Sequence, residues 1–125
     1  MFTTAVNNTN LNFITAGPTA GMVANPATDS ITVNTFGVYE INYSLSNQIV
    51  AVGSVQYSLF LNNTTAVAAS NMFFQANVAL LTTRSPGSNT ILITLNPSDI
   101  ITVRPTAVVG VVSYGNPNLV VKKIF

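Results

Sequence analysis

Alternation of apolar and polar side chains along short segments constrains the fold of this chain most strongly. In residues 38–45, Tyr39, Ile41 and Tyr43 fall on one face of an extended strand, and the polar residues between them fall on the other. Residues 54–62 repeat the pattern, and the Asn62-Asn63 pair that closes them is a tight-turn signal. Both segments therefore predict strands with one buried face.

Turn-forming residues separate further strand candidates along the whole chain and leave no room for a helix. Breakers of this kind stand at residues 16–18, 25–26, 85–87, 96–97 and 116–117. Many short strands at close spacing are typical of a β-sandwich or barrel. We expect one all-β domain over residues 1–125, a two-sheet antiparallel jelly-roll sandwich whose core strands lie in 31–125, with residues 1–30 unassigned. The expected strands cover residues 31–34, 38–45, 54–62, 66–69, 72–82, 90–95, 100–103, 108–114 and 119–125.

The shortage of charge indicates self-association. Charged residues make up 6% of the chain, against about a quarter in an ordinary globular domain. The segments 72–81 and 108–112 are apolar on both faces, whereas a two-layer sandwich buries one face of each strand. A subunit interface would cover the second face, and packing under a loop is the alternative. We expect a closed dimer or trimer with Phe73, Phe74 and Tyr114 as interface contacts.

The composition excludes several classes of function. A net charge of +1 gives no basic patch for nucleic acid or an anionic membrane, and no apolar run reaches the roughly 20 residues of a membrane-spanning helix. The chain has no His and no Cys. This excludes Ser-His-Asp catalysis, cysteine nucleophiles, disulfides, and zinc sites built from imidazole or thiolate.

The remaining candidates for catalysis are the carboxylates Asp29, Glu40 and Asp99. A glycosidase needs two carboxyl groups facing each other across a sugar, and these residues leave that alternative open. Their positions on a polar strand face, at a turn and before a strand favour structural roles. We therefore expect no enzyme, no cofactor and no strong metal site; a calcium site built on a symmetry axis by several subunits remains an alternative.

One segment carries a resemblance to a known superfamily. Ile31, Gly37, Tyr39, Ile41 and Tyr43 have the spacing of its signature strand, in which Gly37 is expected to permit the turn into the strand. The turn and strand after Leu95, with Asp99, form a second match, although Ser98 stands where glycine is usual. The chain thus resembles the tumour-necrosis-factor-like (TNF-like) and complement globular-head jelly-roll superfamily. This resemblance implies a fold and a homotrimer, but no chemistry.

Within that superfamily, the amino-acid composition, rich in Asn, Thr, Ala and Val and poor in charge, resembles that of the BclA-like C-terminal heads of bacterial collagen-like glycoproteins. Such heads belong to the exosporium, the outermost layer of the spore surface. The resemblance implies an extracellular or spore-surface structural head that trimerises, nucleates a stalk and forms its exposed tip. The alternative is a head that binds a receptor or glycan, as on a phage fibre or bacterial adhesin. No Gly-X-Y repeat occurs in the chain itself.

Overall fold

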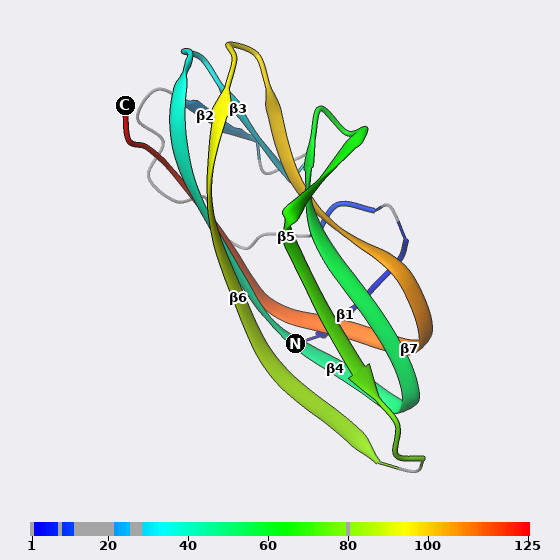
Figure 1. Ribbon diagram of the computed structural model, residues 1–125. Coiled ribbons are helices and arrows are strands. Elements are labelled where there is room, and N and C mark those ends of the chain that lie inside the picture. The colour runs from blue at the N-terminus through cyan, green and yellow to red at the C-terminus, as the bar shows by residue number, and fades with distance from the viewer. Residues whose placement is uncertain (1, 8, 12–21, 26–28, 80) are drawn as a thin grey trace.

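The computed structural model describes residues 2–7, 9–11, 22–25, 29–79 and 81–125, and all of the regular elements within these ranges are strands. Figure 1 shows two long, bent strands that dominate the molecule. The elements are β1 (Phe2–Thr4), β2 (Met22–Asn25), β3 (Ser30–Val33), β4 (Gly37–Leu61), β5 (Thr65–Ala76), β6 (Thr82–Leu95) and β7 (Ile100–Lys123).

Strands β4 and β7 pair antiparallel along almost their whole length and bend together at the lower end of the molecule (Figure 1). Ala51, Ala107 and Gly110 have φ angles of 63°, 53° and 82°, and the register of the pair shifts there. Such irregularities re-aim a strand. The bends divide the described strands into two layers, and β4 and β7 contribute to both.

The first layer contains β1, residues 111–123 of β7, residues 37–50 of β4, and β6. The second contains β2, β3, residues 100–109 of β7, residues 53–61 of β4, and β5. Neighbouring strands within each layer are antiparallel. Among the described strands, β6 and β5 are thus the last strands of the two layers on the same side of the molecule.

The core lies between the layers and follows from the alternation in β4. Tyr39, Ile41 and Tyr43 point inward from the first layer and are at most 1% exposed. Tyr57 and Leu59 face them from the second layer and are fully buried. Each large side chain of this kind contributes roughly 1.5–3 kcal/mol to folding. The prediction that these residues form the core is confirmed.

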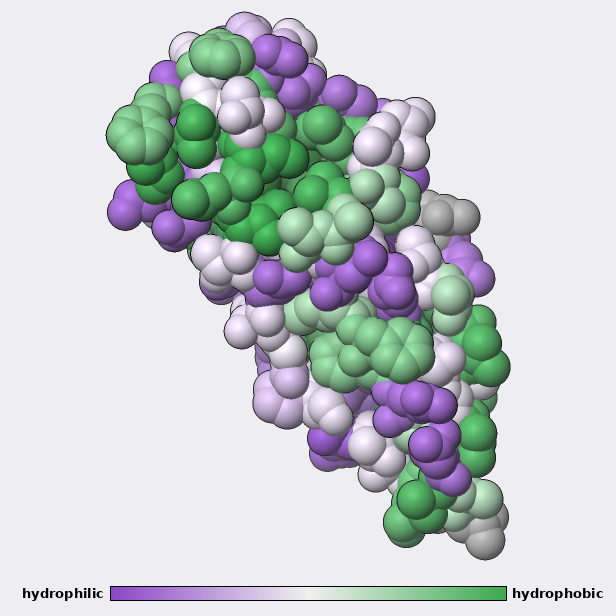
Figure 2. Space-filling view, in the orientation of Figure 1, coloured by the Kyte–Doolittle hydropathy of each residue, from purple (hydrophilic) through white to green (hydrophobic). Residues whose placement is uncertain are grey.

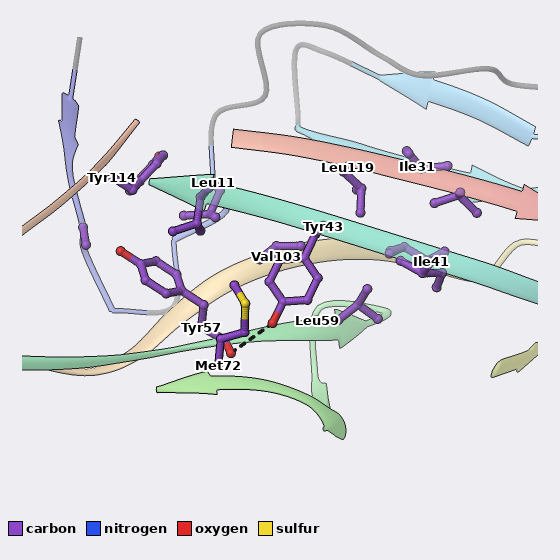
Figure 3. Packing of buried hydrophobic residues seen from close by; sticks show 14 of the residues in the cluster. Leu11, Ile31, Ile41, Tyr43, Tyr57, Leu59, Met72, Val103, Tyr114 and Leu119 are labelled. Carbon is purple, nitrogen blue, oxygen red and sulfur yellow. Dashed lines mark hydrogen bonds between the residues drawn. The ribbon is translucent and has the colours of Figure 1, made fainter. Parts of the chain in front are cut away.

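Buried tyrosines also connect the two layers by hydrogen bonds (Figure 3). The Tyr43 hydroxyl donates to the carbonyl oxygens of Ser70 and Tyr57. The Tyr57 hydroxyl donates to Oδ1 of Asn47 at 2.8 Å, and Asn47 is itself buried. Since an unpaired buried polar group costs about 1–3 kcal/mol, these bonds keep polar atoms in the core at little net cost.

The strand boundaries differ from expectation in several places. Segments expected as separate strands are continuous in β4, β5 and β7. The expected strand 72–82 is interrupted after Ala76, where β5 ends, and Thr82 begins β6. The breakers expected at 85–87 and 116–117 lie inside β6 and β7. Proline is tolerated at Pro86 because β6 is an edge strand. The turns at Asn62-Asn63 and Asn96-Pro97 are confirmed, and the breaker at 16–18 lies outside the described residues.

Candidate functional site

The side chains that carry the superfamily resemblance are packing residues. Ile31, Tyr39, Ile41, Tyr43 and Leu95 are all buried, with at most 6% of each exposed. Burial raises the pKa of the Tyr43 hydroxyl above its usual value, against the opposing effect of its hydrogen bonds with Asn89 and Ser70. A phenol held neutral in the core stabilises the fold and offers no reactive group to a substrate.

Gly37 serves a different purpose from the expected turn. The described glycine with a positive φ is Gly110, not Gly37. A Cβ at residue 37 would instead collide with the carbonyl oxygen of Phe125 and lie 2.7 Å from Cε of Lys123. The end of the chain runs directly over Gly37, and the amide of Ile124 donates to the carbonyl oxygen of Val38 at 2.8 Å. Glycine is needed here for close approach.

Asp99 joins two turns at the end of the sandwich. Its Oδ2 accepts the amide of Asn96 at 2.9 Å, and its Oδ1 accepts the side-chain amide of Asn62 at 3.1 Å. Asn62 in turn accepts the amide of Ile100 at 2.9 Å. These bonds hold the β4–β5 turn against the β6–β7 turn, so the carboxylate has a structural role.

The described residues do not assemble an acidic site. Glu40 lies on the outer face of the first layer, between Leu92 of β6 and Lys122 of β7. Asp29 precedes β3 and has a φ of 52°. Within the described ranges, no three side chains of the His, Cys, Asp and Glu type gather closely enough to hold a metal ion.

The three residues expected at a subunit interface lie in different environments. Phe73 on β5 is 61% exposed. Phe74 is half-buried, and its ring meets Tyr57 edge-on with centroids 5.8 Å apart. Tyr114 is only 4% exposed, and its ring meets Tyr57 edge-on with centroids 6.4 Å apart. Within one chain, Tyr114 is a core residue with little surface left for a partner; Phe73 is the residue of the three most available to one.

Edge strands β5 and β6 flank one side of the sandwich, which we call the open side. On this side, apolar side chains that pack against the core are partly exposed to solvent. Figure 2 shows a continuous hydrophobic area over its upper part. The half-buried residues that pack against the core from these edges and from the end of β4 are Leu61, Val67, Phe74, Ile91 and Ile93. Sequence reasoning missed Ile91 and Ile93 as surface candidates, because their alternation with polar residues is the pattern of an ordinary buried face.

A second apolar area lies at the bends of β4 and β7. It consists of valines that are 41–65% exposed in the described structure: Val50, Val52, Val109 and Val111. The segment 108–112 does carry apolar side chains on a second face, as the sequence indicates, and within one chain that face lies open to solvent. The described structure therefore does not provide the covering loop that was the alternative.

An open hollow of about 410 Å³, lined by both polar and apolar atoms, lies on the outer face of the first layer. Short side chains on β4 and β6 leave this space unfilled, and a bulge of β7 lies at one side of it. The register of β4 with β7 shifts between Ser44 and Ser46, and Asn116 in the bulge has a φ of 51°. The lining residues are Ser44, Leu45, Ser46, Pro86, Gly87, Ser88 and Asn116.

No known family profile and no curated protein matches the chain in sequence. Solved structures match its fold. The Eiger TNF of S. frugiperda has a TM-score of 0.64 at 13% identity, over 83% of this chain and 69% of that one. The globular domain of the zebrafish complement 1qA protein has a TM-score of 0.61 at 15% identity, over 100% of this chain and 91% of that one. The chain therefore has the all-β, antiparallel jelly-roll fold of TNF and complement globular heads.

Proposed function

We propose that this chain is a homotrimeric head that assembles through its open side. The observation that carries the proposal is the half-buried apolar strip of Leu61, Val67, Ile91 and Ile93. Phe73 is exposed on the outer face of the edge strand β5 that borders this strip. A monomer gains by covering such a strip, and a second copy with the same low charge can pack against it without burying unpaired ions. The 6% content of charged residues fits a chain that hides much of its surface in this way.

A closed ring is the expected form of this assembly. A single patch of this kind either pairs with itself about a two-fold axis or contacts a different surface of the next copy and closes into a ring. We propose the three-fold ring because the resemblance of the chain to the TNF-like superfamily implies a homotrimer.

The mass of the purified domain in solution tests the proposal. Sedimentation velocity should give three times the 13.2 kDa of one chain. Phe73→Glu places a charge on the outer face of edge strand β5, which borders the open side, and should yield monomers that retain the circular dichroism spectrum of strands. Thr94→Glu is the control, because Thr94 is exposed on the outer face of β6 and belongs to neither apolar area. A monomeric unmodified chain, or a Phe73→Glu variant that keeps its full mass, would contradict the proposal.

Phe74→Glu is a less informative variant for this purpose. Because Phe74 packs against Tyr57 within its own chain, a carboxylate there is expected to damage the fold as well as any contact between copies. The loss of oligomer mass in this variant is expected together with a lower free energy of unfolding.

We further propose that the head ends a collagen-like glycoprotein of the exosporium, nucleates its stalk and forms its exposed tip. Two observations support this: the amino-acid composition is poor in charge and rich in Asn and Thr, and the fold is a jelly roll. Antibodies raised against the purified head should label the outermost layer of intact spores of the source organism in electron micrographs. A full-length gene without Gly-X-Y repeats before this domain, or label confined to the spore interior, would refute this part.

A head that binds a glycan or receptor is the second candidate, and the hollow on the first layer favours it. Its lining contains no charged residue. A neutral, hydroxyl-rich surface suits a ligand of the same character, whereas assembly alone gives no reason for a hollow there.

A further inference from the structure

The hollow on the first layer owes its shape to three neighbouring strands. Ser44 and Ser46 project outward from β4, Ser88 and Pro86 project outward from β6, and Asn116 rises from the bulge in β7. Serine side chains are too short to fill the space between their neighbours. The paired backbone at Leu45 and Gly87 therefore forms the floor.

The polar groups of this lining are available to a ligand. In the part of the chain that the structure describes, the side chains of Ser44, Ser46, Ser88 and Asn116 have no hydrogen-bond partner. Three hydroxyls and one amide thus provide both donors and acceptors on one concave surface. The neighbouring outward residues of β4 differ: Asn42 donates to Thr90, and Gln48 accepts from Arg84.

The β7 bulge aims the amide at this space. It places three steps of β7, from Gly115 to Asn118, opposite two steps of β4, from Ser46 to Ser44. The extra residue allows Asn116 to adopt its left-handed conformation, which asparagine tolerates better than most residues. Bulges are over-represented where a side chain has to be re-aimed.

We infer that this hollow binds a neutral sugar. A lining without Asp, Glu, Lys or Arg gives no advantage to a charged ligand. Hydroxyls and an amide match the alternating donors and acceptors of a hexose, and the Pro86 ring gives an apolar surface for its C–H groups. Arg84, further along β6, is engaged by Gln48 at 2.9 Å and lies 5.5 Å from the centre of the Phe2 ring. The inference rests on the second candidate function, the glycan-binding head, and does not require the trimer.

Titration of the isotope-labelled domain with methyl glycosides of glucose, galactose, mannose and N-acetylglucosamine tests the inference. Amide signals of Ser46, Gly87, Ser88 and Asn116 should shift with at least one of the four at millimolar concentration. Ser88→Leu fills the hollow and should abolish these shifts. Asn116→Gly keeps the backbone conformation, removes the amide and should weaken binding about tenfold, the effect of one or two hydrogen bonds. Thr94→Leu, on the same outer face of β6 but outside the hollow, should bind as the unmodified chain does.

Three results would overturn the inference: no shift with any of the four sugars, shifts that survive Ser88→Leu, and a stronger response to N-acetylneuraminic acid than to the neutral sugars. The last would point to Arg84 as the binding group. Solution mass is measured on the same samples. A Phe73→Glu monomer that still binds sugar shows that sugar binding does not depend on the trimer. A trimer that binds no sugar refutes the sugar-binding inference and leaves the trimer proposal standing.

Discussion

The ring of Phe74 occupies the space beside Gly87, so that a Cβ added at residue 87 would lie 2.5 Å from Cζ of Phe74. Phe74 belongs to β5 in the second layer and Gly87 to β6 in the first. The missing side chain at residue 87 thus allows an aromatic ring to bridge the two edge strands. At this level the side between β5 and β6 is closed by Phe74, and the apolar strip is left open elsewhere along it.

Gly87→Ala is expected to destabilise the fold by about 1–3 kcal/mol, because the new methyl group forces the Phe74 ring away from Tyr57. The cost should fall when Phe74 is shortened to leucine. Urea denaturation of the two single variants and the double variant measures the coupling. If Gly87→Ala lowers the free energy of unfolding equally with phenylalanine and with leucine at residue 74, the contact with the Phe74 ring is not the reason that glycine is needed at residue 87.

Stability should decline above about pH 10, where tyrosine ionises in the unfolded chain. Burial raises the pKa of Tyr43 and of Tyr57, and nearby Tyr114 adds to the shift at Tyr57. The folded chain therefore keeps protons that the unfolded chain releases, so rising pH favours unfolding by roughly 1.4 kcal/mol per pH unit for each such group. The free energy of unfolding, measured by urea denaturation at pH 9–11, should fall less steeply with pH in Tyr43→Phe than in the unmodified chain. Identical slopes would contradict the burial of an un-ionised Tyr43.

The alternation in β4 made the core predictable, and polar residues on the inner face hid the middle of that strand. The sequence predicts two strands, over residues 38–45 and 54–62, whereas β4 runs through both without a break, from Gly37 to Leu61. Asn47 continues the inward row, and its pairing with the Tyr57 hydroxyl requires two segments to meet across the core. The inward positions Ser85 and Gly87 concealed the first half of β6 for the same reason. Local patterns do not report long-range partners.

The candidate sites depended even more on long-range geometry. Inward residues of β7 have odd numbers at Ile101 and Val103 but even numbers at Val112 and Tyr114. The bend between them changes which face each residue occupies. Because the segment that ends at Tyr114 is apolar on both faces, the sequence alone does not indicate which of these faces is inward. The hollow requires β4, β6 and β7 side by side and a bulge at Asn116. The sequence shows only an Asn-Pro pair there.

Thr102→Val is expected to stabilise the fold by about 1 kcal/mol. Thr102 is fully buried in the described structure, and its hydroxyl has no hydrogen-bond partner there. Valine has the same shape and removes the unsatisfied group. Ser70→Ala is the contrasting variant, because the Ser70 hydroxyl donates to the carbonyl of Val67 and accepts the amide of Leu59 at 2.8 Å. It should lower the urea midpoint, and a Thr102→Val variant that also lowers it would show that the hydroxyl is satisfied in solution.

Gly37→Ala is expected to cost about 1–3 kcal/mol, because the added methyl group meets the backbone carbonyl of Phe125. The nearby Cε of Lys123 ends a flexible side chain and moves away easily, whereas the backbone of Phe125 is held by the bond from Ile124 to Val38. Hydrogen exchange at the Ile124 amide should therefore be faster in the variant. In a chain shortened to Lys123, the same substitution should have little effect on the urea midpoint. A full cost in the shortened chain would mean that alanine at residue 37 disturbs the start of β4 itself, as the turn interpretation of this glycine requires.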